Sequence, residues 1–258
     1  MALRKSSKIS VQTDFQKEYS GTDVLLNAEE GLIGYNLDVV KKMARGLGIH
    51  DIVNARGGGR LAVVEFGAGT GALAEVWRHL FNFDPICVEI DPNLIQILQS
   101  KGFKTADDIS KLASKTPLLY TSNVLEHIED DITALKAIKA KIEPGGKLAI
   151  YVPALPLLFS DLDRKVGHFR RYRKKELIRK VKLAGFEVQN CYFNDSIGVA
   201  ASLILKIVGY KTQKGLGSKK SLVFYDRYAY PVSKALDRLI FKHIIGKNLI
   251  LFATNPKP

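Results

Sequence analysis

The most constraining feature of this sequence is an apolar run that ends in a glycine-rich turn and continues as a helix. Residues 61–66 are followed by Gly67-Ala-Gly-Thr-Gly71, and the apolar spacing over 72–80 is typical of a helix. Glycines let backbone amides approach a ligand closely, and a helix N-terminus offers unpaired N–H groups to an anion. The segment therefore predicts a ligand-binding junction between a buried strand and a helix.

Short apolar runs and amphipathic helices continue to alternate along the chain. A helix precedes the first strand and is expected to stop at Gly46 and Gly48. Further strands are predicted at 85–89, 103–106, 117–121, 147–152, 186–193 and 248–253, with helices at 92–100, 130–142 and 174–184. Pro144-Gly145-Gly146 is predicted to be a turn. This alternation indicates an α/β fold with a doubly wound, mostly parallel sheet of seven strands.

The C-terminal part departs from this rhythm. Residues 196–210 are strongly apolar for a surface helix, 211–220 have the composition of a mobile linker, and 231–245 are amphipathic. We expect an N-terminal extension over 1–30, a domain formed by 31–195 and 247–258, and a helical insertion over 196–246. The insertion can serve as a lid over a pocket, as a patch on the sheet edge or as a dimer interface.

Charge is unevenly distributed over the two parts of the chain. Residues 1–150 hold 18 basic and 19 acidic side chains, whereas residues 151–258 hold 21 basic and 7 acidic ones. Such an asymmetry can mark an anionic partner, namely nucleic acid, a phosphorylated small molecule or an anionic membrane face. Excess lysine that keeps the protein in solution also explains it.

Cysteine content and the apolar segments bear on localisation. Two cysteines do not support a disulfide framework and suggest a reducing compartment. The longest apolar stretch, 197–205, falls short of the roughly twenty residues that a bilayer span needs, and no signal peptide is recognised. We expect a cytoplasmic protein, for which apolar helices beside the basic region allow peripheral contact with a membrane.

Two cofactors fit the glycine turn. Gly67–Ala72 matches the dinucleotide pattern with alanine in the third position, which leaves a nicotinamide or flavin nucleotide open. S-adenosylmethionine is the alternative, and Glu65 favours it because a carboxylate there would repel a pyrophosphate but suits a cationic amino-acid moiety. Glu89, at the end of the second strand, can accept both hydroxyls of a ribose.

The sequence resembles class I S-adenosylmethionine-dependent methyltransferases. Residues 63–71 resemble their first motif, Val88-Glu-Ile-Asp-Pro92 the second and Asp108-Ile109 the third, while 122–130 and Glu143-Pro-Gly-Gly146 resemble the fourth and fifth. The resemblance implies a Rossmann-like methyltransferase fold. Asp107 is as near as Asp108 to the position that meets the adenine. The cofactor contacts that it implies are Glu65, Phe66, Gly67, Ala68, Gly69, Gly71, Glu89, Ile90, Asp108, Ile109, Asn123 and Val124.

Further segments resemble one bacterial subgroup of these enzymes, which is often found near or fused to sugar-transfer enzymes. They are Gly34-Tyr-Asn36, Val152-Pro-Ala154, Asp163-Arg164, Gly167-His-Phe-Arg-Arg-Tyr172 and Tyr225-Asp-Arg227, and the similarity runs over about 31–258. The resemblance implies methyl transfer but does not fix the acceptor. Together with the motifs that are absent after the fourth strand, we predict metal-independent transfer to an oxygen or nitrogen atom of a small-molecule or lipid/sugar-linked acceptor.

Two histidines are the candidate catalytic bases. Transfer to a hydroxyl or a protonated amine requires removal of a proton, and imidazole titrates near neutrality. His127 follows the fourth strand and His168 follows the fifth, both at the edge where open α/β sheets bind ligands. As structural alternatives, His127 can brace its turn and His168 can act as a hydrogen-bonding residue.

The segment after the fourth strand narrows the chemistry. Ser122-Asn-Val-Leu125 differs from the Asn/Asp-Pro-Pro-aromatic motif of exocyclic-amine nucleic-acid methyltransferases, and no cysteine stands beside a proline there. No pair of aspartates suggests a Mg²⁺ site, so we predict no metal. A basic RNA-binding module with a methyltransferase-like fold and an NAD-dependent oxidoreductase are the alternative functions.

Seven basic residues crowd into 164–175, interleaved only with Phe169 and Tyr172, which are too few to stack nucleic-acid bases. We therefore predict no nucleic-acid partner and assign Arg171 and Tyr172 to an anionic group of the acceptor. Helix-start charges that face solvent are the alternative interpretation. The acceptor is expected to lie among Tyr19, Tyr35, the turn at His127, residues 168–172 and the insertion.

Overall fold

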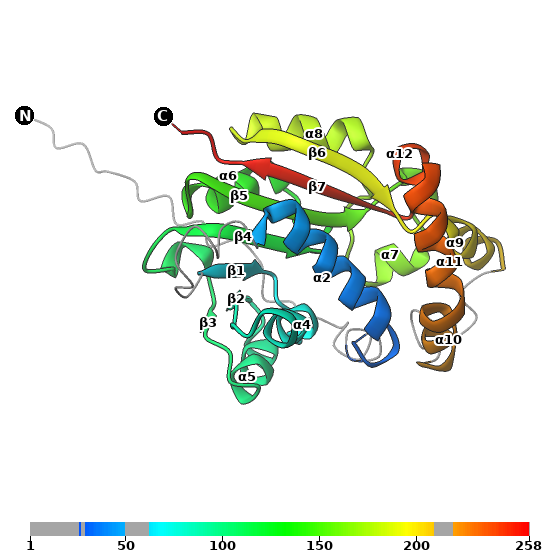
Figure 1. Ribbon diagram of the computed structural model, residues 1–258, viewed down its shortest axis with the longest axis horizontal. Coiled ribbons are helices and arrows are strands. Elements are labelled where there is room, and N and C mark those ends of the chain that lie inside the picture. Colours follow the sequence, from blue (N-terminus) through cyan, green and yellow to red (C-terminus); the bar gives the residue numbers. More distant parts are fainter. Residues whose placement is uncertain (1–25, 27–28, 50–61, 209–218, 258) are drawn as a thin grey trace, which may run out of the picture.

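The computed structural model describes residues 26, 29–49, 62–208 and 219–257, which form a seven-stranded sheet with helices on both faces (Figure 1). The sheet order is β3-β2-β1-β4-β5-β7-β6. In chain order the strands are β1 (Val63–Phe66), β2 (Ile86–Val88), β3 (Thr105–Ala106), β4 (Thr116–Ser122), β5 (Ile142–Pro153), β6 (Glu187–Asn194) and β7 (Asn248–Thr254).

Strand directions confirm the predicted mostly parallel sheet. Strands β1 to β5 pair in parallel, whereas β7 is antiparallel to both of its neighbours, β5 and β6. Strand β6 therefore runs in the same direction as β5. As a result, the carboxyl ends of six strands meet at one edge, and the chain returns from that edge through β7.

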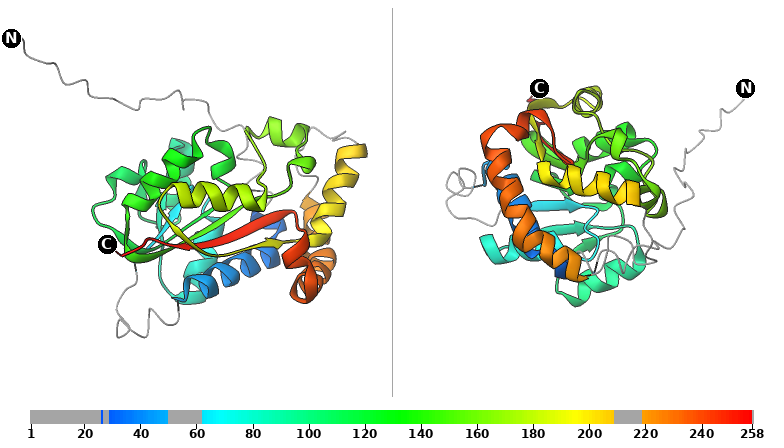
Figure 2. Two further views of the ribbon diagram at one scale, coloured as in Figure 1. Left: turned by 90° about the horizontal axis from the view of Figure 1, so that it is seen from above. Right: turned by 90° about the vertical axis from the view of Figure 1, so that its right-hand side faces the viewer.

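Helices cover both faces of the sheet. Helices α2 and α4 lie on one face, and α6 and α8 lie on the other (Figure 2). The helices are α2 (Ile33–Leu47), α4 (Ala72–Phe81), α5 (Pro92–Ser100), α6 (Asp131–Ala140), α7 (Asp161–Lys165), α8 (Lys174–Leu183), α9 (Ser196–Val208), α10 (Lys219–Phe224), α11 (Tyr230–Leu236) and α12 (Lys242–Ile244). Short 3-10 turns are η1 (Ile109–Lys111), η2 (Leu125–His127) and η3 (Pro156–Leu158).

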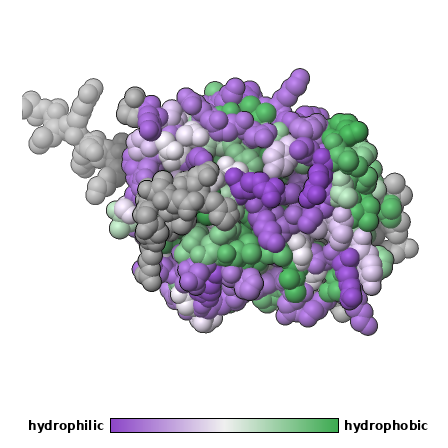
Figure 3. Space-filling view, in the orientation of Figure 1, coloured by the Kyte–Doolittle hydropathy of each residue, from purple (hydrophilic) through white to green (hydrophobic). Residues whose placement is uncertain are grey.

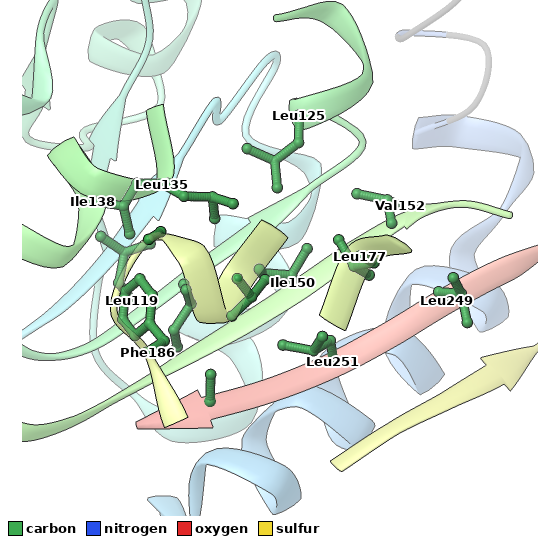
Figure 4. Close-up of a cluster of buried hydrophobic side chains, with 14 of the residues drawn as sticks. Leu119, Leu125, Leu135, Ile138, Ile150, Val152, Leu177, Phe186, Leu249 and Leu251 are labelled. Carbon is green, nitrogen blue, oxygen red and sulfur yellow. The ribbon is translucent and has the colours of Figure 1, made fainter. Parts of the chain in front are cut away.

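The core follows the two-residue period of the strands. In β4, Leu118 and Tyr120 pack on the α2/α4 face with Trp77, whereas Leu119 packs on the opposite face with Leu177 (Figure 4). Alternate strand residues point to opposite faces, so a strand that is covered on both sides is apolar throughout. Each such buried side chain stabilises the fold by about 1.5–3 kcal/mol.

Two glycine positions differ from expectation. Helix α2 continues through Gly46 and ends at Gly48, which adopts a left-handed conformation with φ 67°. Gly46 is a packing position, because a Cβ there would lie 2.2 Å from the Phe252 ring. The expected turn at Gly145 and Gly146 is part of β5, where their backbone groups pair with Asn255.

The insertion is more helical than expected. Residues 219–244 are helical throughout, since π-helical segments η4 (Tyr225–Ala229) and η5 (Asp237–Phe241) join α10, α11 and α12. Proline has no N–H for the α-helical ladder, and the π-helical turn η4 just before Pro231 is one way to accommodate it. Most of the expected linker, 211–218, lies outside the described residues. No described helix is both long enough and apolar enough to cross a membrane.

A buried polar cluster fastens the insertion to the end of β6. Asp195 has φ 67°, and its Oδ1 accepts hydrogen bonds from Gly198 N at 3.1 Å, Ser233 Oγ at 3.0 Å and the Tyr225 hydroxyl. The backbone amide of Asp195 donates in turn to Asp237 Oδ2 at 2.7 Å. The cluster thus holds the start of α9 against η4, α11 and η5 at the carboxyl edge of the sheet.

Candidate active site

The glycine turn after β1 is shaped by left-handed backbone conformations and by a close contact with the segment after β4. Gly67, Gly69 and Gly71 have φ values of 74°, 57° and 88°. Gly67 N donates to Val88 O at 2.8 Å, and a Cβ at Gly67 would lie 2.2 Å from Val124 Cγ2. The glycine turn is therefore packed between the end of β2 and Val124, the residue just before η2.

Glu89 holds its carboxylate beside this turn. Its Oε2 accepts from Gly69 N at 2.8 Å, and its Oε1 accepts from Ile90 N at 2.8 Å and Asp91 N at 3.2 Å. Of the roughly four acceptor sites of a carboxylate, these three bonds leave one, on Oε2. The side chain of Ile90 is 60% exposed at the same strand end, where it is free to pack on a ligand. The position of the Glu89 carboxylate beside the glycine turn is suitable for a ribose contact, which stays a prediction.

Glu65 lies beneath the turn and is almost fully buried. Its Oε2 accepts the Tyr120 hydroxyl at 2.9 Å. Burial and, to a smaller extent, the negative charge of Glu89 together raise the pKa of Glu65 to about 8, although the hydrogen bond from Tyr120 opposes the rise. A nearby cation would stabilise the ionised form, so this carboxylate is suited to a cationic ligand group. The next residue, Phe66, is partly buried, and its carbonyl accepts from Thr121 Oγ1 at 2.9 Å.

The predicted adenine end contains Asp107, Asp108 and Ile109. Asp108 caps η1 through a 2.6 Å bond from Ser110 N, whereas Asp107 is paired with Lys111 at 2.6 Å. Ile109 is buried and anchors the turn in the core. Of the two acidic residues, Asp108 is held in place by η1, because its side chain caps that turn. This fixed position fits the adenine contact predicted for Asp108.

Asn123 stands where β4 ends. It is exposed and has φ 54°, a conformation that is uncommon outside glycine and is concentrated at functional sites. Its amide donates to Tyr151 O at 2.8 Å, which fixes the turn to β5. Asn123 and Val124 thus lie next to the glycine turn, as their predicted cofactor contacts require.

The two candidate histidines meet at the carboxyl edge. Their ring centroids are 4.6 Å apart in an edge-to-face arrangement. His168 Nδ1 lies 2.8 Å from Asp163 Oδ1, and His168 Nε2 lies 3.9 Å from Glu126 Oε1. A 2.8 Å backbone bond from Phe169 N to Glu126 O joins the two segments. Strand order explains the meeting, because β4 and β5 are adjacent.

Burial and charge set the protonation of this cluster. Burial and, to a smaller extent, the neighbouring His168 together lower the pKa of His127 to about 4. Burial raises the pKa of Glu126 to about 8, although the charge of Arg171 opposes the rise. Burial also disfavours the Asp163 carboxylate, but hydrogen bonds from His168 and Arg171 outweigh it and hold the pKa of Asp163 well below its usual range.

Three members of this neighbourhood were missed by the sequence analysis as site residues. Glu126 and Asp163 join the histidines; both lie in segments that carry the family resemblance, but nothing in the sequence assigned a role to either side chain. Lys247 is the third, at the start of the returning chain. Burial lowers its pKa, the charge of Arg171 lowers it further, and Asp195 and Asp163 act in the opposite direction.

Of the acceptor residues predicted around this edge, Tyr172 needs correction, and the others stay predictions. Tyr172 is fully buried and donates to Asp131 Oδ2 at 2.7 Å, which leaves no surface for an acceptor, so it is a core residue. Arg171 is nearly buried, and its Nε is 2.8 Å from Asp163, so its first partner is internal. Tyr35 is partly buried, and its hydroxyl is 2.5 Å from that of Tyr151. Tyr19 lies outside the described residues.

Comparisons with known proteins agree with this architecture. Residues 38–190 match a family model described as a methyltransferase domain. A search of curated protein sequences found no significant match. A Thermotoga maritima structure, described as an S-adenosylmethionine-dependent methyltransferase and possible histamine N-methyltransferase, is 15% identical with a TM-score of 0.57, covering 93% of this chain and 100% of that one.

Two further solved structures are similar in fold. One is the complex of the Haloferax volcanii Trm112 methyltransferase activator with a methyltransferase, at 11% identity and a TM-score of 0.53, covering 94% of this chain and 99% of that chain. The other is Haemonchus contortus phosphoethanolamine N-methyltransferase 2 in complex with S-adenosylmethionine, at 14% identity and a TM-score of 0.50, covering 80% and 52% of the two chains.

Proposed function

Because the chain belongs to the methyltransferase domain family and is an S-adenosylmethionine-dependent methyltransferase, we propose that its acceptor is a small molecule or a lipid- or sugar-linked molecule, methylated on oxygen or nitrogen. The observation that carries this proposal is the pair of His127 and His168 at the carboxyl edge. The segment that leads to His127 contacts the glycine turn through Val124 and Gly67. The family membership also decides against the oxidoreductase and the RNA-binding module as the primary function.

The residues of the turn fit the methyl donor. The backbone of Gly67 and Gly69 would line it, Glu89 would accept from its ribose hydroxyls, and Asp108 with the Ile109 amide would meet its adenine. Glu65 supports this fit, because a buried carboxylate with a pKa of about 8 is stabilised by a cationic amino-acid moiety. When bound, S-adenosylmethionine supplies an electrophilic methyl group whose bond to sulfur breaks, with the electron pair remaining on sulfur.

The histidines handle the acceptor's proton in this proposal. Asp163 accepts from His168 Nδ1, which orients the ring and leaves Nε2 toward the interior of the cluster. His127 is neutral at physiological pH because burial lowers its pKa to about 4. The acceptor's nucleophilic atom would lie between these rings and the donor, where a proton can pass to an imidazole nitrogen.

The insertion supports a lipid-linked acceptor. In Figure 3 hydrophobic side chains gather at the right, over helices α9–α12. Their exposed fractions reach 74% at Leu239, 63% at Phe224 and 61% at Ile244. Basic residues stand among them, including Arg227, Lys234, Arg238 and Lys242. Apolar side chains with interspersed cations suit peripheral contact with an anionic membrane surface.

A methylation assay tests the proposed acceptor class. The purified chain is incubated with a cell lysate and S-adenosylmethionine or its methyl-deuterated form, and the organic and aqueous extracts are compared by mass spectrometry. We expect a product that gains one methyl group and shifts with the isotope, absent with a Gly69→Asp variant. A methylated protein or nucleic acid as the sole product would refute the proposal.

A sedimentation assay tests the membrane contact. We expect the protein to sediment with anionic vesicles and less with neutral ones, and Leu239→Glu to weaken the association. Leu183→Glu is the matched control, because Leu183 is 54% exposed on α8, outside the insertion. Equal losses for both variants would show that general charge, and not this surface, governs sedimentation.

A further inference from the structure

Glu126, His127 and His168 place one ligand-type atom each within 4.8 Å of one another. We propose that these three side chains bind a divalent transition-metal ion, with zinc as the reference ion, and that an oxygen atom of the acceptor occupies its open position. The proposal rests on the function proposed above and deepens it. It changes the expectation of metal-independent transfer and gives the two imidazoles the role of ligands.

The Glu126 carboxylate is an independent sign that a partner belongs here. Its side chain is fully buried, and neither Oε1 nor Oε2 has a hydrogen-bond partner within the described part of the chain. His168 Nε2 is 3.9 Å from Oε1, which is beyond hydrogen-bond distance. A buried acceptor pair without donors is costly, and a cation between it and the imidazoles removes that cost.

Both imidazoles are oriented as metal-ligating histidines usually are. His168 directs Nδ1 to Asp163 at 2.8 Å, so Nε2 is the nitrogen left for a ligand. Backbone groups of Gly167 and Val166 hydrogen-bond to His127 and orient its ring. Second-shell contacts of this kind, from a carboxylate or a backbone carbonyl, fix the tautomer and raise ligand basicity.

The local charge accommodates a dication. Arg171 is the fixed cation beside the cluster, and Asp163 neutralises it through the 2.8 Å contact to Nε. Lys247 is the second cation on this side, and burial lowers its pKa. With an ion bound, an ionised Glu126 would supply the single negative charge of the three ligands, and the two imidazoles would supply none. The three ligands and a dication together carry a single positive charge, which an ionised acceptor oxygen cancels.

The donor set selects the type of ion. One carboxylate and two imidazoles suit zinc and its neighbours in the first transition row rather than Mg²⁺ or Ca²⁺, which prefer oxygen ligands. A tetrahedral ion with bonds of about 2.1 Å sets its ligands about 3.4 Å apart, so binding requires shifts on the order of 1 Å. The fourth position would hold the acceptor hydroxyl, whose proton passes to water as coordination lowers its pKa.

Metal binding can be measured without turnover. The untagged full-length protein is dialysed against a chelator and titrated with ZnCl₂, MnCl₂ and MgCl₂ by calorimetry, and with CoCl₂ by visible absorption. We expect a single zinc or cobalt ion per chain and far weaker magnesium binding. Glu126→Gln, His127→Gln and His168→Gln should each weaken zinc binding by at least about 100-fold. His79→Gln is the matched control, because His79 is exposed on α4.

A parallel titration with S-adenosylhomocysteine separates this proposal from the proposed function. Retained S-adenosylhomocysteine binding together with site-specific zinc binding supports both. If S-adenosylhomocysteine binds but zinc does not, or if the three variants leave zinc affinity unchanged, the metal site is refuted and the gap around Glu126 holds water. If zinc binds specifically and S-adenosylhomocysteine does not, the metal site stands and the proposed function fails.

Discussion

A single methyl group added at Gly67 should destabilise the protein through two separable effects. Gly67 has φ 74°, and a Cβ there would lie 2.2 Å from Val124 Cγ2 and 2.8 Å from Cγ1. Carbon atoms in contact normally lie about 3.5–4.0 Å apart, so either the glycine turn or the start of η2 must move. Gly67→Ala therefore probes the contact that joins the cofactor turn to the segment after β4.

The magnitude follows from these two terms. A left-handed backbone costs an alanine about 1–2 kcal/mol, and overpacking costs about 1–3 kcal/mol, for a total of about 2–5 kcal/mol. Gly102→Ala is the matched control. Gly102 has φ 83°, but its added Cβ would meet nothing closer than Arg78 Nη2 at 3.9 Å. It should cost only the backbone term, about 1–2 kcal/mol.

Equilibrium urea unfolding, followed by the fluorescence of the single tryptophan, Trp77, measures these costs. We expect Gly67→Ala to be about 1–3 kcal/mol more destabilising than Gly102→Ala. Val124→Ala removes both clashing methyl groups, so the double variant should recover most of that difference as a favourable coupling energy. Equal costs for the two glycine variants, or no recovery with Val124→Ala, would refute the contact.

Three further predictions concern the interior of the site. Gly69→Asp should abolish S-adenosylhomocysteine binding in calorimetry while far-ultraviolet circular dichroism stays unchanged, and retained binding would contradict the placement of the donor. Burial raises the pKa of Glu65 from 4.5 to about 8 in the folded state, so its stabilising effect is full below 4.5 and is lost as the pH rises through 8. Between about pH 4.5 and pH 8 the wild type should therefore lose up to about 1.4 kcal/mol of stability per pH unit through this group, and Glu65→Gln should remove that slope. Tyr172→Phe should cost about 1.5–3 kcal/mol of stability through the lost bond to Asp131 and leave S-adenosylhomocysteine affinity unchanged. Lost turnover at unchanged stability would return Tyr172 to the acceptor site.

The sheet could be predicted because its determinants are local. A strand covered on both faces is apolar at every position, as Leu118, Leu119 and Tyr120 are, and glycine turns and helix starts mark where each strand ends. Contacts between distant segments had to be seen. The local pattern predicts a helix stop at Gly46. Its packing partner, Phe252, lies about two hundred residues further along the chain, so nothing in the local sequence shows that this glycine is needed for packing.

The acceptor residues were less predictable, because a basic side chain looks the same in sequence whether it faces solvent, a ligand or an internal carboxylate. Arg171 was assigned to an anionic acceptor, yet the carboxylate that it meets is Asp163, eight residues earlier. Tyr172 follows it in the chain and points the other way, into the core at Asp131. Successive side chains of an extended segment point in opposite directions, so Arg171 and Tyr172 contact different parts of the protein although they are neighbours in one motif.

The histidine pair shows how topology turns separate motifs into one site. His127 and His168 belong to segments that leave neighbouring parallel strands at the same edge, so the strand order β4-β5 alone brings them into reach. Glu126 joins them because it precedes His127 in the short turn η2, and its carboxylate lies within 4.8 Å of both imidazoles. Among the described residues no donor reaches this buried carboxylate, so the cluster is incomplete as a set of these protein groups. What completes it, an ion or a water, decides whether the imidazoles act as ligands or as bases in methyl transfer.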